Sequence, residues 1–195
     1  MRLFVAIALP EPVQQQLAQL RRELAGARWV RPEQLHLTLA FLGEVAEERL
    51  EQLTAALGSI RYQPFALQFD RLGCFPNQRH PRVVWIGLQP NPELQRLAQA
   101  VQAAVTACGI SLEKRPFHAH ITLARLKEAD PRQLAALLTQ QPALPEVAVA
   151  TFLLFQSRLS VQGAEHRVLR RFVAPPHLPW SSAGWPGQHL PPAGS

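Results

Sequence analysis

Residues 36–43 read HLTLAFLG, and 84 residues later (120 − 36) residues 120–127 read HITLARLK. In both copies apolar residues alternate with His and Thr, which is the pattern of a half-buried strand. Side chains alternate between the two faces of a strand, so each copy presents an imidazole and a hydroxyl on one face. We therefore predict two related strands whose polar faces meet across one site.

Two further matches keep the same order along the chain. The segment PEPVQQQLAQ from Pro10 resembles PNPELQRLAQ from Pro90, at an offset of 80 residues, and a proline before the next apolar run recurs at an offset of 81. Three ordered matches indicate two tandem β-α-β-α-β units with small insertions. We expect repeat units of about 1–75 and 80–158 within a single domain covering 1–173.

Apolar periodicity predicts the secondary structure. Helical spacing of apolar residues occurs in four segments, at 13–24, 46–57, 94–105 and 134–138. Two of these helices are preceded by a capping residue and a proline, Asn91-Pro92 and Asp130-Pro131. Short apolar runs predict strands at 2–8, 35–41, 65–71, 82–88, 117–125, 147–156 and 166–173. This alternation indicates an α/β or α+β protein.

The composition bounds the class of protein. The 195 residues carry 20 Lys and Arg against 14 acidic residues, a net charge of +6, and nearly all the cations are Arg. Arg suits phosphate oxygens, which favours a polyanionic partner, although the same excess also serves solubility alone. Cys74 and Cys108 lack the spacing of a zinc or redox site, so we expect buried free thiols.

The two ends of the chain differ in character. The opening MRLFVAIALP is too short to span a bilayer and is followed by no cleavage signal, so it predicts a strand. Together with the free thiols it favours a cytoplasmic protein. Residues 174–195 contain six prolines, three glycines and no charged side chain, which predicts a flexible tail.

Two histidines and two threonines suit displacement at phosphorus. In-line attack requires one group to take a proton from the incoming oxygen and another to give one to the departing oxygen. Each imidazole can serve as acid or base near neutral pH, and Thr hydroxyls can donate to the non-bridging oxygens. A 2′,3′-cyclic phosphate contributes ring strain and needs no metal.

The paired motifs HLTLAFLG and FHAHITLAR resemble those of the 2H phosphoesterases, in particular the RNA 2′,3′-cyclic phosphodiesterases formerly described as 2′-5′ RNA ligases. The segments RLFVAIALP, GCFP, VVWIGL and FQSRLSVQGAEHRVLRRF are similar as well. The likeness covers about residues 1–173. It implies an α+β, bilobal fold in which two antiparallel-rich sheets, related by pseudo-twofold duplication, surround a central cleft with helices outside.

The resemblance also implies an activity, the metal-independent opening of RNA 2′,3′-cyclic phosphate ends to 2′-phosphates. It implies that His120 is the proton acceptor that activates water and that His36 is the proton donor to the 3′ oxygen. Thr38 and Thr122 take the phosphate-binding positions. We expect a monomer without cofactor, metal or membrane contact, whose partner is RNA with a cyclic phosphate end, tRNA halves being one candidate source.

Three residues near the motifs are secondary candidates. Arg125 closes the second motif and suits phosphate, but strict alternation places it opposite His120, so strand twist or a terminal position must bring it round. Phe41 holds the equivalent place in the first copy, where an aromatic side chain stacks a base or belongs to the core. His118 shares the face of His120 and either steers RNA or lies at the edge of the cleft.

Two other functions fit the same residues. In the first, the protein binds RNA ends without hydrolysing them. In the second, His118, His120 and His36 hold a metal ion, since His-x-His on a strand directs both rings to one face. No carboxylate partners lie beside either motif. Within the enzyme class, formation of a 2′-5′ linkage is the reverse-type reaction.

Overall fold

The computed structural model describes residues 1–113, 116–160 and 163–175. The strands in these ranges are β1 (Arg2–Ala8), β2 (Ala27–Trp29), β3 (His36–Glu44), β4 (Phe65–Leu67), β5 (Phe69–Phe75), β6 (Val83–Leu88), β7 (His120–Leu126), β8 (Val147–Val149), β9 (Thr151–Ser160) and β10 (Gly163–Val173). The helices are α1 (Glu11–Ala18), α2 (Leu50–Gly58), α3 (Pro92–Ala107) and α4 (Pro131–Leu138), with 3-10 turns η1 (Pro32–Gln34) and η2 (Glu47–Arg49). The expected tail lies, from residue 176 onward, outside the described residues.

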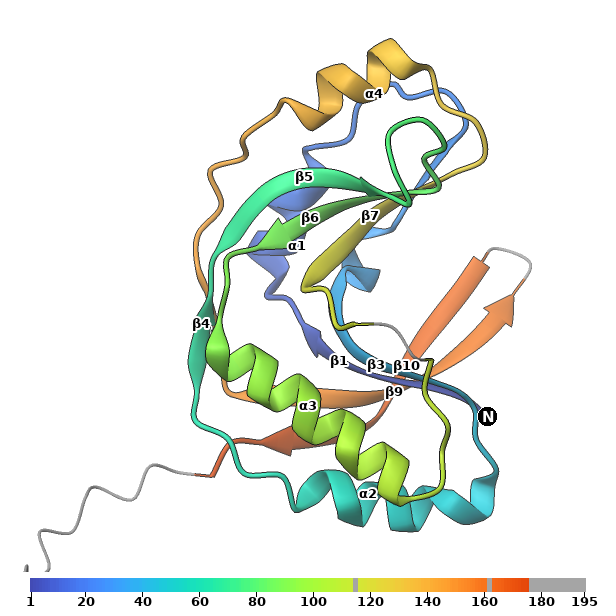
Figure 1. Ribbon diagram of the computed structural model, residues 1–195, viewed down its shortest axis with the longest axis vertical. Coiled ribbons are helices and arrows are strands. Elements are labelled where there is room, and N and C mark those ends of the chain that lie inside the picture. The colour runs from blue at the N-terminus through green and yellow to red at the C-terminus, as the bar shows by residue number, and fades with distance from the viewer. Residues whose placement is uncertain (114–115, 161–162, 176–195) are drawn as a thin grey trace, which may run out of the picture.

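Most strands belong to one antiparallel sheet with the order β10-β9-β1-β3-β7-β6-β5, and β2 pairs with β7 beside this path. Figure 1 shows two curved halves, with β1, β3, β9 and β10 below and β5, β6 and β7 above. A single pair of residues, Leu37 and Ile121, joins the halves through β3 and β7. The α+β class and the bilobal arrangement are therefore confirmed, and the two expected sheets meet at this one pair.

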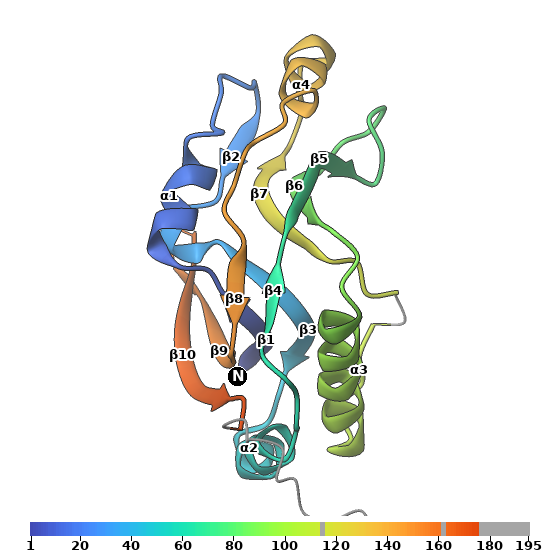
Figure 2. The same ribbon diagram turned by 90° about the vertical axis from the view of Figure 1, so that its left-hand side faces the viewer.

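The pairing register shows where the pseudo-twofold axis passes. Leu37 pairs with Ile121, its own counterpart 84 residues later (121 − 37). Ala66 of β4 pairs with Ala148 of β8 at an offset of 82 (148 − 66), one residue more than the offset of 81 between the prolines that precede these strands. Figure 2 shows β4 and β8 side by side on the outside of the molecule. A residue that pairs with its own duplicate lies on a twofold axis, so the sequence repeat is also a structural one.

Helices cover the face of the sheet that carries Leu37 and Ile121. Helix α3 packs on β3, α4 packs on β5, and α2 packs against α3 and β10. Both predicted caps form, because the side chain of Asn91 accepts from Leu94 N at 3.0 Å and that of Asp130 accepts from Arg132 N at 2.7 Å. The main hydrophobic core lies between these helices and the sheet.

The first helix is shorter than its apolar spacing predicts. Helix α1 ends at Ala18, while Leu20 and Leu24 are buried in the turns that follow. The chain must reverse here to enter the unpredicted strand β2, and it does so through Gly26 at φ 70°. A Cβ at Gly26 would lie 2.0 Å from the carbonyl oxygen of Glu128, so only glycine fits this turn.

Two further expectations concern the cysteines and the membrane. Both cysteines are free, but only Cys108 is buried, and Cys74 is half-buried. Across the described residues, no helix combines the length and the apolar composition needed to cross a bilayer.

Candidate active site

The four polar side chains of the two motifs surround the pair of residues that joins the sheet halves. That pair is fully buried on the core face, so the adjacent motif residues point to the other face, where all four are half-buried. The register places His36 across from Thr122 and Thr38 across from His120. The two imidazoles are diagonal neighbours, whose Cα atoms lie roughly 7–8 Å apart in such a pair. The structure thus brings the four predicted residues together at the joint between the sheet halves.

The two catalytic candidates are held in the same way. Nδ1 of His36 donates to the carbonyl oxygen of Gln34 at 2.6 Å, and Nδ1 of His120 donates to that of His118 at 2.7 Å. A carbonyl oxygen only accepts, so each Nδ1 carries the hydrogen. In the neutral ring Nε2 is then the acceptor on both sides of the site. The duplication therefore repeats both the residue type and the tautomer.

Burial disfavours the charged form of both rings in the free protein. Burial lowers the pKa of His36 from 6.5 to about 4, although the hydrogen bond to the Gln34 carbonyl raises it. The charges of His166, His120 and Arg125 lower it further. Burial also lowers the pKa of His120, although the hydrogen bond to the carbonyl of His118 raises it. A bound anion has the opposite effect, because negative charge stabilises an imidazolium. An anion bound beside the two rings would therefore favour uptake of a proton from solvent by one of them.

A β-bulge in each copy corrects the prediction from strict alternation. Leu39 of β3 is skipped in the pairing with β1, and Leu123 of β7 is skipped in the pairing with β6. The faces therefore exchange after each bulge, since one extra residue shifts the alternation by one. Phe41 and Arg125 consequently reach the side of the histidines and are exposed, Phe41 by 62%. Arg125 is close enough to His36 to influence its pKa.

Aromatic side chains surround His36. Its ring lies 4.9 Å from the ring of Phe4, which stacks on Phe155 at 4.9 Å and lies 6.2 Å from Phe41. The ring of His166 on β10 lies 5.3 Å from His36, edge-on. Phe4 and His166 were not predicted as site residues, because only the pairing of β10, β9 and β1 brings them to His36.

A different set surrounds His120. Phe75 lies 5.1 Å from its ring, Trp85 lies 6.3 Å away, and the exposed His118 lies 5.6 Å away on the same face, as predicted. His118 packs edge-on against Phe75 and Trp85, both at 5.1 Å. Trp85 lies over Gly73, where a Cβ would come within 2.3 Å of the indole. The large indole of Trp85 fits on β6 because Gly73 on the neighbouring strand β5 has no side chain.

The described residues contain no group of three His, Cys, Asp or Glu side chains arranged to hold a metal ion. His118 and His120 share a face as expected, but with His36 they do not form such a group. The donor set that the metal alternative requires is therefore not assembled in this part of the chain.

A family model described as LigT-like phosphoesterase matches the chain twice, over residues 7–85 and 86–165. The RNA 2′,3′-cyclic phosphodiesterase of Archaeoglobus fulgidus is 38% identical over 177 residues, which cover 88% of this chain and 99% of that protein. The protein of the same name from Thermus thermophilus is 38% identical over 184 residues, covering 88% and 89% of the two chains.

Solved structures agree with these matches. Escherichia coli LigT in its apo form superposes with a TM-score of 0.73 at 34% identity, covering 89% of this chain and 96% of that one. LigT complexed with 3′-AMP gives a TM-score of 0.73 at 33% identity, covering 89% and 97%. The matches span most of the chain and both of its repeats, which confirms the resemblance first carried by the two motifs. The chain therefore belongs to the LigT-like phosphoesterase family of 2H phosphoesterases.

Proposed function

We propose that the protein hydrolyses RNA 2′,3′-cyclic phosphate ends to 2′-phosphates by acid–base catalysis at its two motif histidines. The observation that carries this proposal is the pair of imidazoles related by the pseudo-twofold, each with Nδ1 tied to a carbonyl, which leaves Nε2 of each neutral ring as the acceptor. The relatives named RNA 2′,3′-cyclic phosphodiesterase support the substrate class.

The reaction follows from the positions of the two rings. His120 takes a proton from water as the water oxygen bonds to phosphorus. The bond between phosphorus and O3′ breaks on the opposite side, and His36 gives its proton to O3′. The product carries a 2′-phosphate and a 3′-hydroxyl, and the net proton transfer from His36 to His120 is reversed by solvent. Thr38 and Thr122 donate hydrogen bonds to the non-bridging oxygens.

The unequal surroundings of the two histidines support this polarity. O3′ departs toward the acid, so the ribose and the RNA chain attached to it lie on the side of the acid. The side of His36 offers Phe41, exposed and backed by the stacked rings of Phe4 and Phe155, as a surface for the terminal base.

Arg125 completes the site in this proposal. Its exposed guanidinium lies within electrostatic reach of His36 and can pair with a non-bridging oxygen of the same phosphate. We further propose that the protein acts without a metal, as a cytoplasmic monomer, on ends that include those of tRNA halves. Ring strain and two histidines supply what a metal would otherwise supply.

The test is incubation with an oligoribonucleotide that ends in a 2′,3′-cyclic phosphate, in excess chelator, followed by location of the phosphate on O2′ or O3′. We expect a 2′-phosphate, and loss of the reaction in His36→Ala and His120→Ala. His80→Ala is the control, since His80 is an exposed histidine on the β5–β6 loop. Binding without hydrolysis indicates an RNA-end binding module, a 3′-phosphate contradicts the assigned polarity, and loss of activity in chelator contradicts the two-histidine mechanism.

A further inference from the structure

Strand β10 breaks the twofold symmetry of the site. The strands β9, β1 and β3 in one half correspond to β5, β6 and β7 in the other. In the described residues, β10 adds to the outer edge of β9, whereas the sheet ends at β5 on the other side. The side chains that β10 carries therefore stand beside His36 without an equivalent beside His120. Such side chains can give a symmetric catalytic centre a direction.

His166 is the β10 residue that reaches the catalytic centre. It pairs across from Ser157 and is half-buried. Its ring packs edge-on against Phe4 at 4.8 Å and against His36 at 5.3 Å. The imidazole of His166 therefore lies directly beside the ring of His36.

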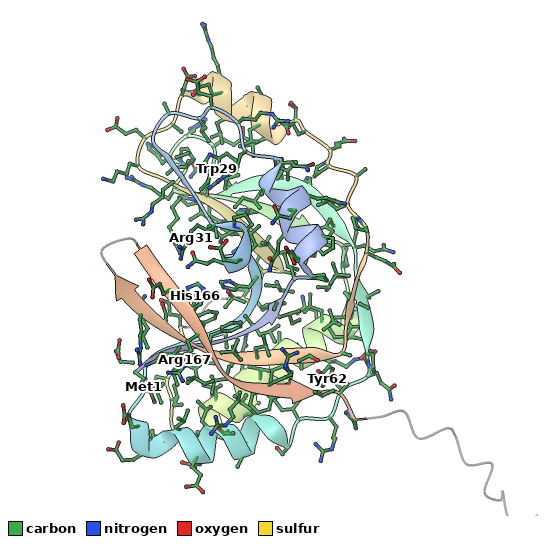
Figure 3. All side chains as sticks on the ribbon, turned by 180° about the vertical axis from the view of Figure 1, so that it is seen from behind. Met1, Trp29, Arg31, Tyr62, His166 and Arg167 are labelled. Carbon is green, nitrogen blue, oxygen red and sulfur yellow. The ribbon has the colours of Figure 1, made fainter. Side chains whose placement is uncertain are left out.

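Arg31 adds a permanent positive charge next to His166. Figure 3 shows the two residues facing the space between the halves of the molecule. Gln34 Nε2 donates to the carbonyl oxygen of Ala164, which ties the segment after Arg31 to the start of β10. Arg31 also pairs with Glu33 at 3.2 Å, but both side chains are at least half exposed, and such a pair is weak enough to yield to a phosphate.

We propose that His166 and Arg31 form a second anion subsite, which binds the phosphate on the 5′ side of the terminal nucleotide and so selects RNA ends over free nucleoside cyclic phosphates. The proposal rests on the proposed function, because O3′ departs toward His36 and the ribose therefore lies on the His36 side. The 5′ phosphate of that ribose is the next anion along the chain. Next to His36 on this side lies His166, which becomes a cation when an anion binds beside it, and Arg31 is a permanent cation beside His166.

The charge balance agrees with an anion site. Burial first, and then the charge of Arg31, lowers the pKa of His166, and the charge of His166 in turn lowers that of His36. A phosphate between Arg31 and His166 reverses both effects. It thereby favours protonation of the ring that must donate to O3′, so recognition of the RNA chain and activation of the acid are coupled.

The minimal test compares uridine 2′,3′-cyclic phosphate with its 5′-phosphorylated form, which differ only in the proposed ligand. We expect His166→Phe, which keeps a ring for packing, and Arg31→Gln to lower kcat/KM for the 5′-phosphorylated substrate about 10- to 100-fold, the range for a lost charged hydrogen bond. The ratio of kcat/KM for the 5′-phosphorylated substrate to that for the unphosphorylated one, which cancels any effect of the variant on His36, should fall by the same factor. Arg167→Gln is the control, because Arg167 is exposed on the opposite face of β10.

Equal losses on both substrates would show that His166 acts only through the position of His36, and equal activity of all variants would show that no subsite exists. Either result overturns the proposal. His166→Gln and thermal unfolding distinguish misfolding from lost recognition. Binding of uridine 2′-phosphate with and without a 5′ phosphate is measured in parallel. If the unmodified protein hydrolyses neither substrate, the proposed function is wrong. The difference in affinity between the two forms of uridine 2′-phosphate still decides whether the subsite exists.

Discussion

The two halves of the site share their reactive groups and differ in nearly everything around them. Both present a histidine fixed by a carbonyl two residues earlier and a threonine on the same face. The pairing register makes Phe4 and Ala6 the counterparts of Val83 and Trp85. Phe41 likewise corresponds to Arg125. At these positions the half with His36 carries the rings of Phe4 and Phe41, and the half with His120 carries Arg125 and the indole of Trp85, so equal chemistry is combined with unequal recognition.

The difference extends to how the halves are packed. Ala6 lies beside Leu153 in one half, whereas Trp85 lies over Gly73 in the other. Large and small residues have thus exchanged strands between the copies while filling the same layer. A duplicated fold can therefore keep its catalytic geometry and still give each side of the substrate its own surface.

The largest expected effect concerns what the halves share. His36→Ala and His120→Ala should each lower kcat about 10²- to 10⁴-fold, because each removes one of two proton transfers in the same step. The double variant should be little worse than either single one, since the two residues act as a unit. Steady-state hydrolysis of a cyclic-phosphate oligonucleotide measures this. Full activity in either single variant would mean that the symmetric pair is not the catalyst.

The pH dependence should be large as well. The reaction needs one proton on the pair, and the pKa of both rings is lowered in the free protein, that of His36 to about 4. The proton is lost as pH rises, so kcat/KM should fall about tenfold per unit above pH 6.5. Bound phosphate raises both pKa values, so kcat should persist to higher pH. A kcat/KM that stays level from pH 6.5 to 8.5 contradicts this description.

The threonines should show a smaller effect that is equal in the two halves. Thr38→Val and Thr122→Val each remove one donor to a non-bridging oxygen, which should lower kcat/KM about 10- to 100-fold. Thr106→Val on the exposed side of α3 is the control. Losses that differ greatly between the two positions would show that the phosphate does not lie on the pseudo-twofold axis.

The smallest effect tests the unequal packing. Gly73→Ala should lower the free energy of unfolding by about 1–3 kcal/mol, because the added Cβ would lie 2.3 Å from Trp85. Gly58→Ala is the control, since its nearest neighbour would be 3.9 Å away. Urea denaturation measures both. An unchanged free energy of unfolding in Gly73→Ala would show that the layer around Trp85 is loosely packed.

The sequence predicts the duplicated motif and most strands, including β10, but misses the bulges and strand β2. His36, His120 and the duplication follow from matching letters at a nearly constant offset. The two bulges were missed because alternation was extended past Leu39 and Leu123, although the adjacent apolar residues Leu39-Ala40 and Leu123-Ala124 are the visible sign of a shift.

His166 could not be found in the same way. Its place beside His36 depends on the pairing of β10 with β9 and on edge-on packing against Phe4, and these are contacts between the two ends of the chain. Strand β2 is three residues long and carries no periodic signal. Local pattern thus identifies the chemistry, whereas tertiary pairing decides which residues surround it.

The most direct test of the division of labour between the halves uses a cyclic substrate with sulfur in place of O3′, since a thiolate departs without a proton. His36→Ala should hydrolyse this substrate within about tenfold of the unmodified protein, because only the acid has been removed, while His120→Ala should remain impaired by about 10²-fold or more. Rescue of His120→Ala in place of His36→Ala would contradict the assignment of acid and base, and with it the placement of the RNA chain over the aromatic half.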